Sequence, residues 1–197
     1  MTEKKRKPVT KRKEEVFLII SQIIAEKGLS EVSTTEVARR LGVSQPAIYK
    51  YFKNKDEMIV YFLENLKEQL LEIVKKAKEE KTTKDRLKRI YTEHFRLIER
   101  TKILPRVVFS DVIHTGKKEK KEKLREVVNL YKEGIKQIIE EGIKKGEIKD
   151  INPEIGARLF IGTIISTALF WMLNNADKSL IGETESLIKE IEKMIFK

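Results

Sequence analysis

The most constraining feature of this sequence is an uncharged stretch of fifteen residues, Leu159–Leu173. A helix that is apolar all round must be covered on every side. Fifteen residues fall short of the about 20 that a bilayer requires, Arg158 precedes them, and Asn174 and Asn175 follow. We therefore expect a central helix of a soluble domain, with one face in its own core and another against a partner. A transmembrane span is the alternative.

Apolar residues recur at helical spacing along nearly all of the remaining chain. The clearest stripe begins at Ile59 and ends at Ala77, with intervals of three and four residues. Similar patterns predict helices near residues 87–98, 103–113 and 124–146, and a last one close to the C-terminus. Four prolines, nine glycines and the lack of a Pro/Gly/Ser-rich linker argue against a flexible multidomain string. The predicted fold class is all-α, with about nine helices.

The positive charge of the chain is concentrated at its start. The formal net charge is +11, and residues 1–13 contain seven Lys or Arg against one Glu. Such a block is typical of a solvated arm that is attracted to polyanions, either nucleic acid or an acidic membrane surface. We expect residues 1–13 to form a disordered basic arm.

The chain has no cysteine and only two histidines, His94 and His114. This composition excludes a disulfide scaffold, a thiol nucleophile and metal sites built from thiolates. No signal sequence opens the chain, because Lys and Arg fill its start, so we expect a cytoplasmic protein. No nucleophile–base pair and no Gly-rich phosphate loop is visible, and we expect no metal, no cofactor and no enzymatic activity.

Near the N-terminus, a longer helix over residues 14–27 precedes two short helices with strong start signals. Ser33 and Glu36 have the spacing of a capping box, which predicts the start of the first short helix. Gly42 ends that helix, and Ser44 caps the second one. A scaffold helix followed by two short helices and a Gly-containing turn is typical of a helix-turn-helix.

The second short helix presents a polar and aromatic face. Its outward residues are Gln45, Ala47, Tyr49, Lys50 and Tyr51. In a major groove, Gln bonds base edges, Ala contacts a thymine methyl group, and Lys reaches guanine or phosphate. Between positions 34 and 55, five Lys or Arg stand against a single Glu, which suits a polyanion. The alternative is that the aromatic residues only pack in a small helical core.

The stretch from Thr34 to Lys55, TTEVARRLGVSQPAIYKYFKNK, resembles the DNA-binding module of TetR-family transcriptional regulators. The matching positions are Thr34, Thr35, Ala38, Leu41, Gly42, Val43, Ser44, Tyr49, Phe52 and Lys55. The resemblance implies an all-α protein with a DNA-binding head, a small-molecule pocket in the body and a dimer formed by the last two helices. It also implies two sets of DNA contacts. Phosphates would be held by Thr34, Thr35, Tyr49, Tyr51 and Lys55, and the bases would be met by Gln45, Pro46, Ala47 and Lys50.

Three parts are therefore expected: the arm 1–13, a helix-turn-helix domain 14–54, and a helical effector-binding and dimerisation domain 55–197. Candidate ligand residues are polar or aromatic side chains on otherwise apolar faces, namely Tyr91, His94, Phe109, Tyr131, Thr163, Thr167 and Trp171. Some of them can equally well pack in the core or bond to their own helix. The small number of polar side chains on these faces favours a hydrophobic effector, either fatty-acyl or aromatic. The predicted dimer face consists of Phe160, Ile161, Ile164, Ile165, Ala168, Ile188, Ile191 and Ile195.

We predict a homodimeric, ligand-responsive and sequence-specific DNA-binding regulator. It would repress transcription from a palindromic operator in double-stranded DNA and leave it when a small effector binds. A ligand-independent DNA-organising or protein-interaction factor with the same head is the main alternative. An enzyme and a basic membrane-surface protein are further alternatives.

Overall fold

The computed structural model describes residues 9–115 and 118–197. Within these residues it contains ten α-helices, one short 3-10 helix and an isolated bridge between Ile148 and Phe196, which confirms the predicted all-α fold. The helices are α1 (Val9–Lys27), η1 (Leu29–Glu31), α2 (Thr34–Leu41), α3 (Gln45–Tyr49), α4 (Lys55–Lys78), α5 (Thr83–Thr101), α6 (Leu104–Val108), α7 (Asp111–His114), α8 (Lys118–Lys144), α9 (Pro153–Leu173) and α10 (Glu183–Ile195).

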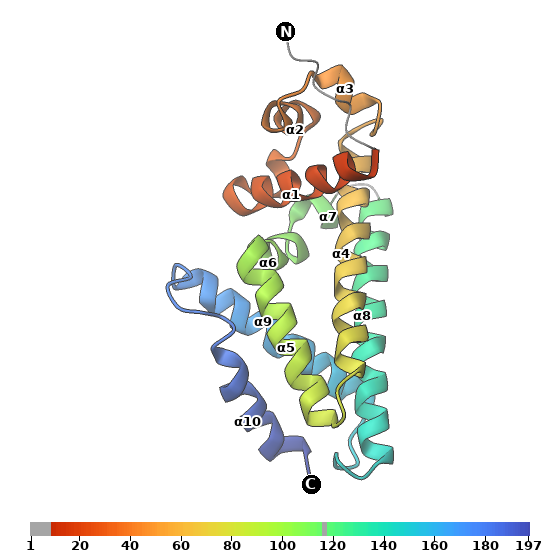
Figure 1. The fold of residues 1–197 in the computed structure, drawn as a ribbon, viewed down its shortest axis with the longest axis vertical. Helices are drawn as coiled ribbons and strands as arrows, with labels where there is room; N and C mark the ends of the chain where they lie inside the picture. Colours follow the sequence, from red (N-terminus) through yellow and green to blue (C-terminus); the bar gives the residue numbers. More distant parts are fainter. Residues whose placement is uncertain (1–8, 116–117) are drawn as a thin grey trace.

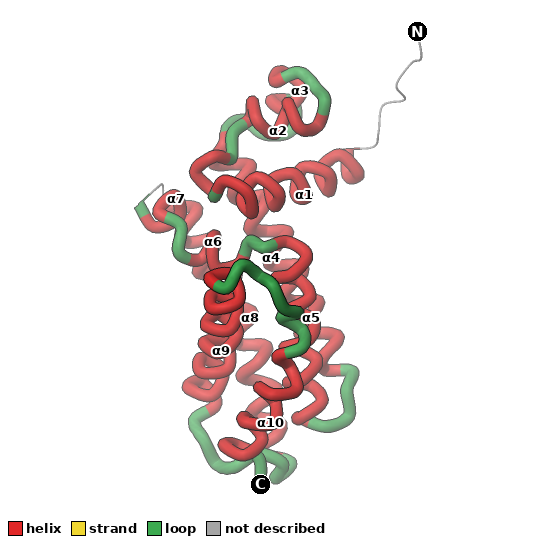
Figure 2. Tube along the Cα trace, turned by 90° about the vertical axis from the view of Figure 1, so that its left-hand side faces the viewer, coloured by secondary structure: helices red, strands yellow, loops and turns green. Residues whose placement is uncertain are grey.

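The helices form an elongated molecule with a small head at one end (Figure 1). Helices α1, α2 and α3 make up the head, and α4 leaves it to run along the body beside α8. Figure 2 shows the head above the body from the side. One continuous apolar core extends through both parts, and the ring of Phe17 in α1 stacks on Phe62 in α4 at 5.3 Å between centroids. The head is therefore attached to the body through α4.

Helices α4 and α8 approach each other closely. A Cβ atom at Gly134 of α8 would lie 2.7 Å from Cγ1 of Val74 in α4, so any other residue at this point forces Val74 or the helices to shift. At the end nearest the head, the ammonium group of Lys120 in α8 binds Asp56 in α4 at 2.6 Å. Lys120 is almost fully buried, which makes this ion pair part of the junction rather than a surface contact.

Two helices differ from the sequence-based expectation. Helix α1 begins at Val9 instead of residue 14, so residues 9–13 of the predicted arm are helical. Lys and Arg at positions 11–13 favour helix, and no glycine or proline interrupts residues 9–13. Residues 1–8 lie outside the described residues. The single helix expected over 103–113 is divided into α6 and α7, because the chain leaves the helical conformation at Ser110.

Helix α9 contains the uncharged stretch and is long and apolar enough to cross a membrane, with a mean hydropathy of 1.6. It packs against α5, α6 and α8 of its own chain. Its exposed face carries Leu159, Phe170 and Leu173, whose side chains are 63%, 65% and 68% exposed. One face of α9 is thus covered by the protomer and the opposite face is left open.

The open face is not the one predicted for the dimer. Four of the predicted residues, Phe160, Ile164, Ala168 and Ile188, are buried within the protomer. The predicted residues Ile161 and Ile165 line a cavity in the body, and Ile191 and Ile195 of α10 are half-buried. The sequence could not separate the two faces, because a helix that is apolar all round has no polar side to mark the solvent.

Candidate DNA-binding surface and effector cavity

The start of α2 is fixed by a side-chain cap. The Oγ atom of Ser33 accepts a hydrogen bond from the backbone N–H of Glu36 at 3.1 Å. At the other end Gly42 adopts the left-handed conformation, with φ of 65°, and its N–H closes the last turn of the helix. These two signals, both read from the sequence, position α2 and the turn that leads to α3.

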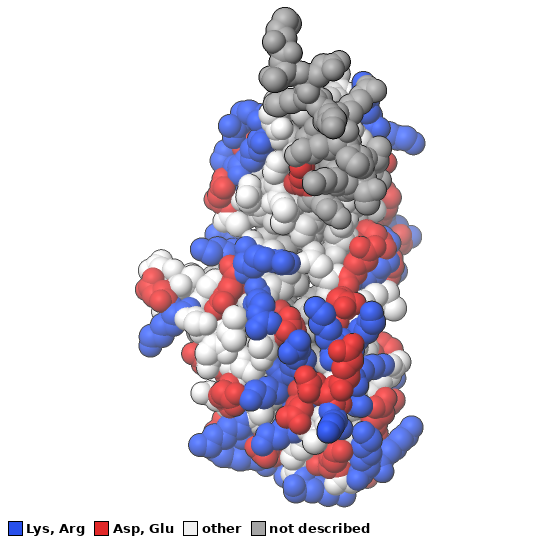
Figure 3. All heavy atoms as spheres, in the orientation of Figure 1, with Lys and Arg blue, Asp and Glu red and all other residues white. Residues whose placement is uncertain are grey.

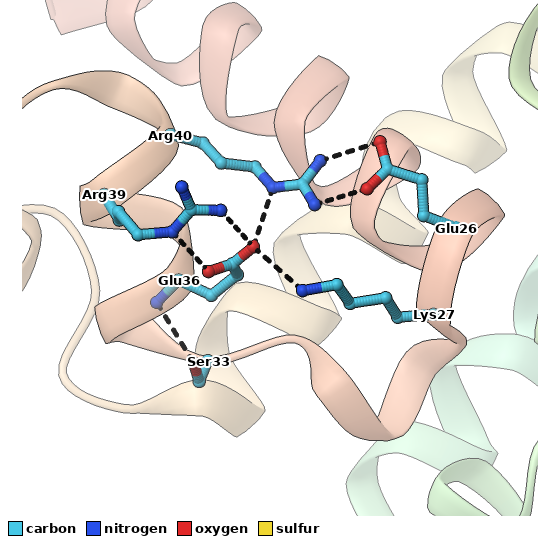
Figure 4. Close-up of polar contacts among 6 residues, drawn as sticks. All are labelled: Glu26, Lys27, Ser33, Glu36, Arg39 and Arg40. Atoms are coloured by element: carbon cyan, nitrogen blue, oxygen red, sulfur yellow. Dashed lines mark hydrogen bonds and ion pairs between the residues drawn. The ribbon is translucent and has the colours of Figure 1, made fainter.

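The carboxylate of Glu36 binds arginines instead of the backbone of Ser33 (Figure 4). It accepts hydrogen bonds from Arg39 at 2.8 Å and from Arg40 at 2.9 Å. Arg40 also binds Glu26 at the end of α1 and thereby joins α1 to α2. The hydrogen bonds from Arg39 and Arg40 hold the pKa of Glu36 far below its usual range. Carboxylates of the head therefore partly neutralise the charges of both arginines. The positive potential expected for this region comes mainly from its lysines.

A polar group joins α2 to α3. The side-chain amide of Gln45 donates to Oγ1 of Thr34 at 3.0 Å, and the hydroxyl groups of Thr34 and Tyr49 are 3.5 Å apart. Thr34 is buried, whereas Tyr49 is 50% exposed. The structure therefore brings three of the predicted DNA-binding residues together, with Gln45 oriented by Thr34.

The remaining predicted DNA-binding residues lie around this group. Thr35, Pro46 and Lys50 are exposed, and Ala47, Tyr51 and Lys55 are half-buried. Helix α3 ends at Tyr49, so Lys50 and Tyr51 belong to the turn after it. The ammonium group of Lys55 donates to the carbonyl oxygen of Ser30 at 2.5 Å, and burial lowers its pKa. A phosphate contact by Lys55 requires this bond to open or to be shared.

The body contains an apolar cavity of about 100 Å³ between α4, α5, α6, α8 and α9. Its wall is formed by Leu70, His94, Ile98, Pro105, Val108, Val128, Tyr131, Ile161, Ile164, Ile165 and Ala168. Nδ1 of His94 and the hydroxyl group of Tyr131 share a hydrogen bond of 2.7 Å. Burial lowers the pKa of His94 to about 3, so the imidazole is neutral at pH 7. The cavity therefore offers no charge and suits an apolar group.

The predicted ligand residues fall in different places. His94 and Tyr131 line the apolar cavity, while Tyr91 and Thr163 bond to each other and the ring of Tyr91 packs against Phe160. Phe109 is 62% exposed. Thr167 and Trp171 line a wider hollow of about 570 Å³ near the end of α9. The sequence did not predict the aliphatic residues of the cavity wall as ligand-binding residues, because they follow the same spacing as core residues.

Helix α4 carries Lys55 in the head and Leu70 in the wall of the cavity, so a single helix connects the two sites. A protein built in this way is a DNA-binding regulator that responds to a small molecule. Residues 21–61 match the family described as "Bacterial regulatory proteins, tetR family", and residues 80–172 match "Tetracyclin repressor-like, C-terminal domain". The chain belongs to the TetR family, whose members bind operator DNA as homodimers.

Comparison with known proteins finds regulators and a nucleoid occlusion factor among the similar proteins. The "Fatty acid metabolism regulator protein" of Bacillus subtilis is 27% identical over 170 residues, which cover 85% of this chain and 87% of that protein. The solved structure of the transcriptional regulator FadR from Bacillus subtilis in complex with stearoyl-CoA superposes with a TM-score of 0.78 at 25% identity, covering 89% of this chain and 95% of that one. The "Nucleoid occlusion factor SlmA" of Vibrio campbellii is 23% identical over 158 residues, 79% of this chain and 81% of that protein.

Proposed function

We propose that this protein is a repressor of genes for fatty-acid metabolism and leaves its operator when a long-chain fatty acyl-CoA binds. The observation that carries the proposal is the uncharged, apolar cavity between α4, α5, α6, α8 and α9. An acyl chain is the ligand group that such a wall accepts most readily. The fatty-acid regulator of Bacillus subtilis and the stearoyl-CoA complex of FadR support the same ligand class.

The size of the cavity suggests how binding is transmitted. A volume of about 100 Å³ is well below the about 300–1,000 Å³ of ordinary ligand pockets. An acyl chain therefore has to push the surrounding helices apart. Leu70 lies on α4, so expansion of the cavity displaces the helix that carries the head. In a dimer, two heads must match half-sites about 34–36 Å apart, and a shift of α4 disturbs that match.

The DNA contacts proposed for the head follow from its exposed groups. Gln45, held by Thr34, and the adjacent Pro46 and Ala47 meet the bases, together with Lys50. Thr35, Tyr49, Tyr51 and Lys55 bind phosphates. The division into a basic arm, a head and a body belongs to the same proposal, with the head extended to the start of α1 at Val9 and the body formed by residues 55–197. The proposal also includes a cytoplasmic location and the lack of enzymatic activity.

The second candidate is a DNA-organising factor that needs no small molecule. The similarity to the nucleoid occlusion factor of Vibrio campbellii favours it. In that case the apolar cavity is only a packing gap, and no ligand opens it.

Fluorescence anisotropy with an operator obtained by selection from random DNA distinguishes the two candidates. Addition of stearoyl-CoA is expected to release the wild-type protein from this operator, whereas CoA alone is not. Ala168→Leu fills part of the cavity and is expected to bind the operator but to resist release. If stearoyl-CoA leaves the operator complex of the wild-type protein intact, the acyl-ligand proposal is wrong and the ligand-independent factor is favoured.

A further inference from the structure

A second hollow, of about 560 Å³, adjoins the apolar cavity at the outer side of α6, α7 and the first turns of α8. Val108 and Val128 line both spaces, so the two adjoin each other at these aliphatic side chains. The outer hollow is also lined by Leu124, and its charged side chains are three cations, Lys118, Lys121 and Arg125, and one carboxylate, Glu122. We call it the basic groove. The apolar cavity therefore opens toward a positively charged surface.

The cations of the basic groove differ from most other cations of the body. On the face shown in Figure 3, Lys and Arg are interspersed with Asp and Glu over the body. Four other lysines of α8 are paired with carboxylates, namely Lys120, Lys123, Lys132 and Lys136. By contrast, within the described part of the chain Lys121 and Arg125 have no hydrogen-bond or ion-pair partner, and Lys118 has only an exposed contact with Glu122 at 3.4 Å.

These three cations share one face of α8. Their spacing of three and four residues places them in a row that leads toward Val128. With a rise of about 1.5 Å per residue, Arg125 lies about 4–5 Å along the axis from Val128, and Lys118 about 15 Å from it. The positive end of the α8 macrodipole lies at the far end of this row. The row thus fits an extended anionic group that begins where the apolar cavity ends.

We propose that the basic groove binds the phosphate-bearing head of the same amphiphilic ligand whose acyl chain fills the apolar cavity. This inference rests on the proposed function and assigns Lys121 and Arg125 as the residues that select an acyl-CoA over a free fatty acid. The carboxylate of a free fatty acid ends near Val128 and can meet only Arg125, the first cation of the row. The phosphates of an acyl-CoA lie farther from the chain and reach along the row.

The test compares ligand binding by wild-type protein and by the double variant Lys121→Ala/Arg125→Ala, using tryptophan fluorescence or calorimetry. We expect the variant to bind stearoyl-CoA about tenfold more weakly because it loses two charge-assisted contacts. Stearate is expected to lose less affinity than stearoyl-CoA, because its carboxylate can meet only Arg125. The affinity of the ligand-free protein for operator DNA is expected to stay unchanged. The affinity of the wild-type protein for stearoyl-CoA should also fall more steeply with salt than that of the variant. The matched control is Lys144→Ala/Lys145→Ala, which removes the same charge at the opposite end of α8.

Each contrary outcome is informative. If the wild-type protein binds neither stearoyl-CoA nor stearate, the proposed function itself fails. Equal affinity of wild type and variant for stearoyl-CoA overturns the assignment of the groove and leaves the proposed function intact. An equal loss of affinity for stearate also overturns the assignment of the groove, because the substitutions then disturb the apolar cavity itself. If the ligand-free variant binds operator DNA more weakly than the wild-type protein, the assignment is also overturned, because the groove then contacts DNA.

Discussion

At the scale of single residues, charge is kept out of the apolar cavity by burial of the His94–Tyr131 pair. Burial lowers the pKa of His94 to about 3 and raises the pKa of Tyr131, so both side chains are neutral at pH 7. The two groups satisfy each other's hydrogen-bonding capacity within an apolar wall. The pair therefore defines one polar point in an otherwise apolar wall.

His94 gives the protein a defined pH dependence. Its pKa is about 3 in the folded chain and about 6.5 in the unfolded chain, so the unfolded state takes up a proton first. Stability from this group is complete above about pH 6.5 and falls as the pH decreases toward 3, by about 2 kcal/mol at pH 5. Denaturant unfolding at pH 7 and pH 5 measures this loss. His94→Gln should reduce it, and the exposed His114→Gln serves as the control. An equal loss in wild type and His94→Gln contradicts the assignment.

The sequence predicted some residue roles and missed others for a physical reason. Ser33 and Gly42 act locally, so their positions were sufficient to predict the ends of α2. The predicted capping role of the Glu36 carboxylate was wrong, because this group binds two arginines of α2. The bond from Arg40 to Glu26 spans fourteen positions and depends on how α1 packs on α2. Local patterns do not contain that information.

At the scale of elements, α4 connects the head to the cavity, and its contact with α8 determines where it lies. The helix is amphipathic over its whole length, which made it predictable from the stripe between Ile59 and Ala77. Its close approach to α8 was not predictable, because an isolated glycine in a helix does not reveal its neighbour. Helix α9 shows the same limit, since a helix was predicted there and its buried face was not.

Gly134→Ala tests the contact between α4 and α8. The added Cβ atom would lie 2.7 Å from Cγ1 of Val74, and we expect a destabilisation of about 1–3 kcal/mol in urea unfolding. Val74→Ala removes the methyl groups that would clash with the new Cβ atom. Gly134→Ala should therefore lower the free energy of unfolding less in the Val74→Ala protein than in the wild type. Additive effects of the two substitutions would show that the methyl groups of Val74 do not limit the approach of the helices.

At the scale of the whole molecule, the protein is a homodimer of the TetR family, and the open apolar face of α9 is the surface that the second protomer can cover. We expect Phe170→Glu to keep its protomer folded, because this side chain is 65% exposed, and to shift the protein toward monomers. Sedimentation velocity measures the change. Leu18→Glu, at a 52% exposed position on α1, is the control for adding a charge to an apolar surface residue. A Phe170→Glu protein that remains fully dimeric would place the interface elsewhere.

We expect that filling the apolar cavity moves α4 and changes the separation of the two heads in the dimer. The most direct test is the distance between spin labels on Lys53→Cys in the dimer, measured by electron paramagnetic resonance with and without stearoyl-CoA. The chain has no cysteine, so each protomer carries one label. We expect stearoyl-CoA to shift the distance by several ångströms away from its value in the operator complex. An unchanged distance in protein that has bound stearoyl-CoA would contradict this expectation.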